Sequence, residues 1–251
     1  MPARDVVRVS GADAVTFLQG QLSQDVAALP VGGSAFSLLL QPQGKVDAWL
    51  RVTRVGDDEL LLDVDAGWGE AVVARLKRFL LRVQVVLEPV EGWGVAAATE
   101  PVDGLFAVVP EVDGFVDLLG PVDLLPPDPP DYEERRIRAG VPRMGSELDE
   151  STIPAAAGVV ERSVSFTKGC YTGQELVARI DSRGGSTPTR LRTLSVTGAP
   201  VGAAVVVGGD EVGRVTSAAG DAALAYVRRE VEPPVDAVVR WEGGEAPARI
   251  A

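Results

Sequence analysis

The sequence contains no histidine and only one cysteine, Cys170, among its 251 residues. The lack of histidine excludes the Ser-His and Cys-His mechanisms that many hydrolases use. A single cysteine cannot form an internal disulfide, and without histidine it cannot complete a zinc site of the usual kind, so we expect no metal site. Cys170 is therefore the one thiol whose role has to be explained.

Aromatic residues, long apolar runs and positive charge are also scarce. Only 5% of the residues are aromatic, which predicts a core of small aliphatic side chains. No run of about eighteen apolar residues is present, and the start MPARDVVRVSG lacks the apolar region of a signal peptide, so we expect a cytoplasmic protein without membrane contact. Lysine and arginine number 24 against 36 acidic residues, and the net charge of -12 disfavours direct nucleic-acid binding.

Apolar periodicity indicates an α+β part followed by an all-β part. It predicts helices over 10–26, 70–81, 131–140 and 173–183, and strands over 34–40, 46–55, 59–65, 83–90 and 93–99, with a hairpin over 105–120. From Thr189 onward, short strands separated by glycine- and proline-containing turns predict a β-barrel of about sixty residues. The proline-dense stretch PVDLLPPDPPD is expected to connect two lobes, and SRGGSTP (182–188) is expected to be a hinge.

The residues around Cys170 read KGCYTGQE (168–175). Thr172 and Glu175 have the spacing of a capping box, which predicts that a helix begins here. Cys170 would then lie just before the positive end of the helix dipole, with Lys168 nearby, and both effects favour the thiolate. The residues alone leave other interpretations open, because a lone cysteine can be a small buried hydrophobe and Lys168 can simply be solvated.

KGCYTGQE resembles the signature of the YgfZ family, folate-binding proteins related to the glycine-cleavage T-protein, an aminomethyltransferase. Other similar stretches follow in the family's order: VSGADAVTFLQGQLSQDV, LLLQPQGKVDAWLRV, RIRAGVPRMGSELDESTIPAAAG, VGRVTSAA and ALAYVRR. The resemblance implies an α+β fold of three lobes in a ring, with ferredoxin-like α+β lobes and a small C-terminal β-barrel. We expect the first lobe to comprise 1–33 and 128–185, the second 34–127, and the barrel 186–251.

The resemblance also implies a function and a ligand. Tetrahydrofolate or a derivative would bind in a hole between the lobes, and the protein would support the assembly or repair of iron–sulfur clusters, with client enzymes or assembly proteins as partners. One alternative is a folate-dependent one-carbon (aminomethyl) transferase related to aminomethyltransferase. Another is a non-catalytic scaffold with a structural cysteine. Cys170 would be the reactive or client-contacting thiol, with Lys168 beside it.

The same resemblance assigns further residues to the folate site. Glu147 lies where T-protein relatives have a glutamate facing the pterin, and a carboxylate can accept two hydrogen bonds from such a ring; the alternative is a solvated loop residue. Arg143 can steer an anionic tail or serve a turn, and Arg179 can reach the folate tail or only pair with Glu175. Tyr171, beside the thiol, is also taken as folate-binding.

Asp47 is a candidate catalytic residue. It keeps one position of the paired aspartates found in T-proteins, whereas Ala48 replaces the other. The loss of the pair argues against aminomethyl transfer. Asp47 can also be an outward-facing residue of a strand.

Overall fold

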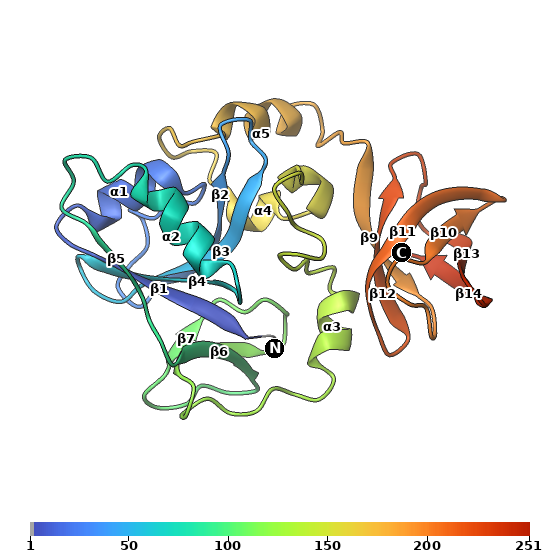
Figure 1. The fold of residues 1–251 in the computed structure, drawn as a ribbon, viewed down its shortest axis with the longest axis horizontal. Helices are drawn as coiled ribbons and strands as arrows, with labels where there is room; N and C mark the ends of the chain where they lie inside the picture. The colour runs from blue at the N-terminus through green and yellow to red at the C-terminus, as the bar shows by residue number, and fades with distance from the viewer. Residues whose placement is uncertain (1–2) are drawn as a thin grey trace.

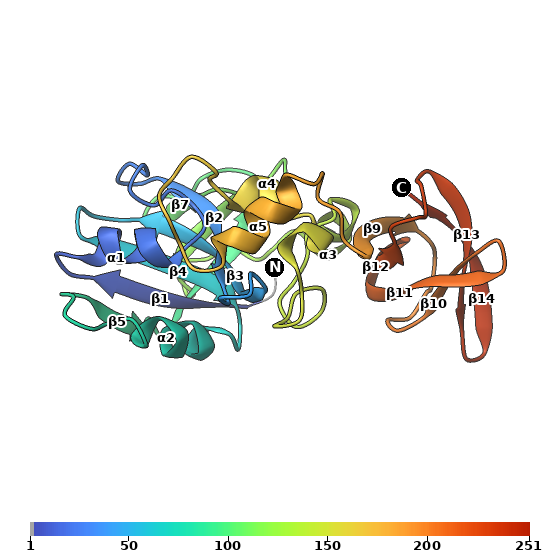
Figure 2. The same ribbon diagram turned by 90° about the horizontal axis from the view of Figure 1, so that it is seen from above.

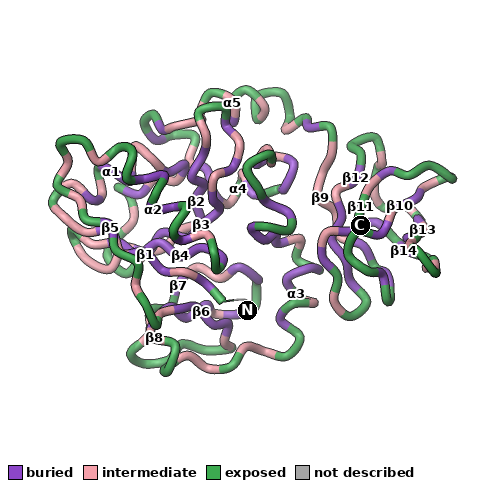
Figure 3. The backbone as a smooth tube through the Cα atoms, in the orientation of Figure 1, coloured by how far each residue is buried: buried purple, intermediate pink, exposed green. Residues whose placement is uncertain are grey.

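A five-stranded antiparallel sheet forms the centre of the amino-terminal part of the computed structural model, which describes residues 3–251 (Figure 1). Its strand order is β2-β3-β4-β1-β5, with bounds β1 Arg4–Ser10, β2 Ser34–Leu40, β3 Val46–Arg54, β4 Glu59–Asp65 and β5 Val86–Pro89. Most residues of β2, β3 and β4 are buried, because both faces of the sheet are covered (Figure 3). This explains why these segments read as nearly continuous apolar runs.

The two faces of this sheet pack against different elements. Val7, Val9 and Leu62 belong to the core cluster that also holds residues of α1 (Ala14–Gln21) and α2 (Gly69–Lys77). On the other face, Val6 and Leu61 pack against a three-stranded sheet of order β6-β8-β7. The strands of this second sheet are β6 Trp93–Ala98, β7 Phe106–Val108 and β8 Val116–Pro121. Because consecutive side chains of a strand point to opposite faces, β1 and β4 each contribute residues to two hydrophobic cores.

Short helices lead from the second sheet to a closed six-stranded barrel (Figures 1 and 2). They are α3 Tyr132–Arg138, the 3-10 helix η1 Pro154–Ala157, α4 Val160–Ser163 and α5 Gln174–Asp181. The barrel order is β10-β11-β12-β9-β14-β13, with bounds β9 Thr189–Ser195, β10 Ala204–Val207, β11 Asp210–Ala219, β12 Ala222–Arg228, β13 Val235–Trp241 and β14 Gly244–Ile250. The barrel contacts α3 through a small apolar cluster of Ile137, Ala222 and Leu224.

The mixed α/β class and the C-terminal barrel are confirmed, whereas the predicted bounds of the first helix, 10–26, are wrong. The helix α1 is shorter, and its N-cap Asp13 makes no side-chain capping bond but accepts a hydrogen bond from the Gln84 backbone N–H. The strand β1 was not predicted. Its charged residues Arg4 and Arg8 conceal the apolar pattern, and the partners that allow Arg4 to be buried lie far along the chain.

The boundaries of the two predicted α+β lobes stay a prediction. β1, from the first predicted lobe, pairs with β4 and β5, both from the second, so the central sheet is not confined to either range. The last strands begin at Thr189, close to the predicted barrel boundary. Within residues 3–251, no helix combines the length and apolar character needed to cross a membrane.

Candidate functional site

A cavity of about 610 Å³ lies where the central sheet, α3 and the barrel meet. Asp65 borders it at the end of β4, Glu133 and Arg136 border it from α3, Arg143 from the following loop, and Ser217 from β11. The other lining residues are Ala3, Ala66, Pro129, Pro130, Tyr132, Met144 and Ser146. The size and the mixture of donors and acceptors fit a small organic ligand.

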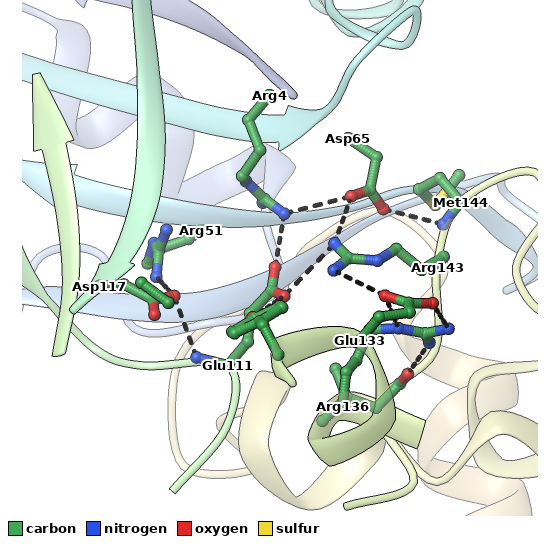
Figure 4. Close-up of polar contacts among 12 residues, drawn as sticks. Arg4, Arg51, Asp65, Glu111, Asp117, Glu133, Arg136, Arg143 and Met144 are labelled. Carbon is green, nitrogen blue, oxygen red and sulfur yellow. Dashed lines mark hydrogen bonds and ion pairs between the residues drawn. The ribbon is translucent and has the colours of Figure 1, made fainter. Parts of the chain in front are cut away.

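Arg143 is the most distinctive side chain of this cavity. It is 7% exposed, and its Nη1 donates to Asp65 Oδ1 at 3.0 Å and lies 3.4 Å from Glu111 Oε2 (Figure 4). Its Nε and Nη2 are buried without a hydrogen-bond acceptor among the described residues, although Nη2 forms a 4.0 Å ion pair with Glu133. Buried N–H groups without acceptors are costly. Two guanidinium nitrogens of a cavity-lining residue thus lack acceptors, and a small shift of the side chain is needed to expose them to a ligand.

A buried network of charges holds Arg143 in place. Arg4 donates to Asp63 at 2.6 Å and to Glu111 at 2.5 Å, and Arg51 joins the same Asp63 to Asp117 of β8. Burial alone would raise the pKa of Glu111, but the nearby arginines Arg4, Arg143 and Arg51 outweigh it and lower the pKa to about 2. The network ties the two sheets to the loop that carries Arg143.

Glu147 lies behind the cavity rather than in its lining. It is 2% exposed, Oε1 accepts from the Ser217 hydroxyl at 2.6 Å, and Oε2 accepts from the Arg143 backbone N–H at 3.0 Å. Its backbone carbonyl accepts from the Tyr226 hydroxyl at 2.8 Å. Both carboxylate oxygens thus have protein partners, and the side chain does not line the cavity. Glu147 joins the Arg143 loop to the barrel.

Buried residues on both sides of Cys170 anchor the motif KGCYTGQE to the rest of the protein. Lys168 is 8% exposed, and its Nζ donates to the backbone carbonyls of Gln19, Leu22 and Gln24 at 2.6, 2.7 and 2.9 Å. Burial lowers the pKa of Lys168 to about 8. The ammonium therefore satisfies the carbonyls at the end of α1, a role that sequence reasoning did not foresee.

The residues after the thiol form the second attachment. Tyr171 is 7% exposed, belongs to the main core, and has its pKa raised to about 12 by burial. Gly173 has φ +83°, and a Cβ there would meet the Gln41 carbonyl oxygen at 2.6 Å. Cys170 itself is exposed. The fold thus holds the thiol at the surface between two buried anchors.

The predicted capping box is wrong, although the helix exists. The N-cap of α5 is Gly173 in the left-handed conformation, and no side chain caps the helix. A left-handed backbone is suited to glycine, which explains why the helix can begin there without the threonine. Glu175 is exposed and pairs with Arg179 instead. The sequence spacing matched a common motif, but the close approach of the backbone to the 40–45 turn decided the geometry.

The structure separates the predicted site residues into two groups. Arg143 lines the central cavity and Glu147 lies next to it, whereas the remaining five do not line it: Asp47, Lys168, Cys170, Tyr171 and Arg179. Asp47 receives a 2.8 Å hydrogen bond from Arg75 Nε of α2. Arg179 lies on the exposed side of α5.

Sequence reasoning missed several polar residues of the cavity and its network. The clearest signal was in β4, ELLLDVD, where Asp63 and Asp65 share a face with Leu61. Two carboxylates on a strand face that must be buried require cationic partners. The pattern could therefore have pointed to a buried charged site, although not to Arg4 and Arg143 as the partners.

Comparisons with known proteins agree with this architecture. Residues 189–238 match the family model "CAF17, C-terminal beta-barrel domain". The chain is 30% identical over 189 residues to an uncharacterized protein of Haemophilus influenzae, covering 71% of this chain and 66% of that protein. It is also 29% identical over 215 residues to the tRNA-modifying protein YgfZ of Edwardsiella ictaluri, covering 71% of this chain and 65% of that one. The chain belongs to the YgfZ family.

Two further similarities extend the comparison. An iron-sulfur cluster assembly factor IBA57 homolog, mitochondrial, of Mycosarcoma maydis is 29% identical over 215 residues, covering 73% of this chain and 53% of that protein. The chain thus spans about half to two thirds of the length of the relatives it matches. The glycine cleavage system aminomethyltransferase T from Bartonella henselae superposes with a TM-score of 0.79 at 20% identity, covering 98% of this chain and 82% of that one. This YgfZ-family protein therefore has the T-protein fold.

Proposed function

We propose that this YgfZ-family protein binds tetrahydrofolate or a derivative in the central cavity and supports the assembly or repair of iron–sulfur clusters in client enzymes. The observation that carries the ligand proposal is the buried Arg143 guanidinium, with two N–H groups that lack acceptors at the edge of the 610 Å³ cavity. The similarity to the iron-sulfur cluster assembly factor IBA57 homolog supports the iron–sulfur role.

The donor and acceptor set of the cavity fits a folate. The pterin ring presents a carbonyl oxygen and ring nitrogens that accept hydrogen bonds, and an amino group and ring N–H that donate. Arg143 supplies donors to such acceptors, while the carboxylates of Asp65 and Glu133 supply acceptors. We assign the pterin-facing carboxylate to one of these two residues rather than to Glu147, because both line the cavity, whereas Glu147 is 2% exposed and lies outside the lining.

A folate carries one-carbon units, and the residues of this cavity would hold and orient it. Arg143, held by Asp65 and Glu111, would bind an acceptor edge or a carboxylate of the ligand after a small shift that exposes Nε or Nη2. The barrel residue Ser217 would close the cavity from the opposite side. Because ordering costs are largely met before binding, such a site favours affinity.

Calorimetric titration with tetrahydrofolate, under exclusion of oxygen, tests the ligand assignment. Arg143→Lys keeps the positive charge beside Asp65 and Glu111 but removes the guanidinium fork, and we expect a loss of affinity of about tenfold or more. Arg179→Lys is the matched control, because Arg179 is exposed on α5 and does not line the cavity. Absence of binding to the parent protein, or equal affinity in Arg143→Lys, would remove the folate from this site.

We assign the contact with client enzymes to Cys170. The support is its exposure between the two anchors, Lys168 and Tyr171, which keep the thiol at the surface. A cluster is commonly held by four protein ligands, so one thiol could share a cluster only with a partner. Cys170 does not line the folate cavity, so thiol and ligand would act at different places.

Cys170→Ser tests this assignment. We expect the folded parent protein to be alkylated by iodoacetamide and the serine variant to keep its unfolding transition but to fail in restoring iron–sulfur enzyme activity to cells that depend on the protein. Thr172→Ala is the control, since that side chain caps nothing. Labelling only after unfolding, together with full restoration by Cys170→Ser, would contradict a role for the thiol.

The Edwardsiella relative is described as a tRNA-modifying protein. The net charge of -12 repels a phosphate backbone, so we propose that a connection with tRNA runs through a client enzyme and not through direct RNA binding. The alternative of aminomethyl transfer has no support from the geometry, because Asp47 is paired with Arg75 and lies outside the cavity lining.

A further inference from the structure

The barrel strand β9 is paired unequally on its two sides. It pairs with β12 along its whole length, from Thr189 to Ser195, but β14 pairs only with Leu194 and Ser195. The Ala251 backbone N–H also donates to the Thr193 carbonyl on that side. The first half of β9 therefore has one edge without a neighbouring strand among residues 3–251.

The direction of the backbone groups follows from this pairing. The Thr193 carbonyl faces the β14 side, and backbone groups of a strand alternate between its two edges. The N–H and C=O of Leu191, two residues earlier, therefore face the same side, where β14 has already ended. An unpaired strand edge is a template for another strand.

A groove of about 590 Å³ runs along this edge. Arg190, Leu191 and Arg192 all line it, although consecutive side chains of a strand point to opposite faces. The groove therefore meets residues of both strand faces, as a groove along the strand edge does. Its far side is formed by η1, α4 and α5, including the apolar residues Val164 and Ile180. In Figures 1 and 2, β9 is the barrel strand on the side facing these helices.

Positive charge accompanies the open edge. Arg190 and Arg192 form none of the ion pairs within 4.0 Å that the described residues make, unlike the barrel arginines Arg240 and Arg249. Burial and then the adjacent charge of Arg190 lower the pKa of Arg192, with Glu232 acting in the opposite direction. Glu161 and Asp181 also line the groove, so an acidic ligand has to turn its carboxylates toward the two arginines.

We propose that β9 accepts an extended segment of a partner protein as an added strand, and that this segment alternates acidic with apolar residues. Its backbone pairs with the Leu191 edge, and its acidic side chains lie opposite Arg190 and Arg192. Its apolar side chains lie on the other face, beside Leu191 and the apolar wall of the groove. In strand addition the main chain supplies affinity and alternate side chains supply specificity, and this edge offers backbone groups for the first and two arginines for the second.

The probe is a fluorescein-labelled peptide of about eight residues that alternates glutamate with valine, titrated with the full chain and followed by fluorescence anisotropy. We expect saturable binding and slower hydrogen exchange of the Leu191 amide. Arg190→Glu/Arg192→Glu should weaken binding by about tenfold or more, because two charge-assisted contacts become repulsive. Lys77→Glu/Arg78→Glu, on the exposed end of α2, is the matched control and should bind as the parent protein does.

A second probe separates strand addition from charge attraction and does not depend on any variant folding. The same peptide with N-methyl groups on its valine nitrogens, the ones that face the Leu191 edge, keeps its charges but cannot form the ladder, and we expect it not to bind. Equal binding of the methylated peptide, equal binding by the double arginine variant, or no binding of the parent protein up to about 1 mM peptide would overturn the proposal. A concentration-dependent dimer that the double arginine variant abolishes would assign the edge to a second copy of the chain and would also overturn it.

Discussion

Replacing Glu111 by glutamine tests the buried network that supports the cavity. Glu111 is 3% exposed, and its oxygens meet Arg4 Nη1 at 2.5 Å, the Tyr132 hydroxyl at 3.0 Å and Arg143 Nη1 at 3.4 Å. Glutamine keeps the shape but removes the negative charge, so Arg4 and Arg143 each lose a buried anionic partner. Loss of one partner of a buried ion pair typically costs about 3–5 kcal/mol.

The pKa of Glu111 gives an independent magnitude. It falls from 4.5 to about 2 on folding, and each pKa unit corresponds to about 1.4 kcal/mol, so the ionised carboxylate contributes about 3 kcal/mol at neutral pH. Because the folded-state pKa is lowered, this contribution is complete above about pH 4.5 and is lost as the pH falls toward about 2. At about pH 3.5 about 2 kcal/mol should remain.

Urea unfolding at about pH 7 and about pH 3.5, followed by tryptophan fluorescence, measures the difference in unfolding free energy between the parent protein and Glu111→Gln. We expect the difference in unfolding free energy to be about 3 kcal/mol at neutral pH and to shrink by about 1 kcal/mol in acid. Glu211→Gln, in an exposed pair with Arg214, is the control and should change stability by less than about 1 kcal/mol at either pH. A Glu111→Gln difference that is independent of pH, or no larger than that of the control, would refute the reasoning.

Three further predictions concern the motif, the barrel contact and the chemistry. Gly173→Ala should destabilise the protein by about 1–3 kcal/mol, because its φ is +83° and the new Cβ would meet a carbonyl oxygen. Gly169→Ala is the control, since a Cβ there meets nothing within 4 Å. Thermal unfolding of both variants checks this. Glu147→Leu should loosen the barrel, seen as faster hydrogen exchange in β11 and β12, since Ser217 and the Arg143 N–H lose their acceptor; unchanged exchange would contradict it. Release of ammonia from a carrier-bound aminomethyl group should not exceed the uncatalysed rate, because Asp47 is engaged by Arg75, and turnover like that of a T-protein would overturn this expectation.

Elements with an intrinsic apolar pattern could be predicted from the sequence. β2 coincides with its predicted range of 34–40, and β4 with 59–65, because both are buried runs bounded by turn residues. β1 could not be predicted in this way. Its burial depends on Arg4 meeting Asp63 and Glu111, and no local pattern shows that such distant carboxylates will converge.

The site residues show the same division between what a local pattern predicts and what contacts between distant residues determine. The helix after Cys170 was predicted from KGCYTGQE, whereas the residues alone left open whether the thiol is exposed or buried. The role of Lys168 as a cap for the end of α1 depends on a contact across 146 residues of sequence. Arg143 lines the cavity, and its role in folate binding stays a prediction. The environment of Glu147 was not foreseen, because a barrel residue seventy positions later donates a hydrogen bond to its carboxylate. Local motifs thus identified the segments, and tertiary contacts determined which atoms are free.

The position of β1 has a consequence for the order in which the chain can fold. Arg4 is buried on contact with Glu111, a residue 107 positions later, and β1 itself needs β4 on one side and β5 on the other. During synthesis the first strand must therefore wait for β4 and β5, which end at Asp65 and Pro89, and Arg4 must wait longer for Glu111. Late closure of such long-range contacts slows folding and exposes strand edges to aggregation. Chaperone dependence during synthesis should accordingly be concentrated in the interval before Glu111 emerges.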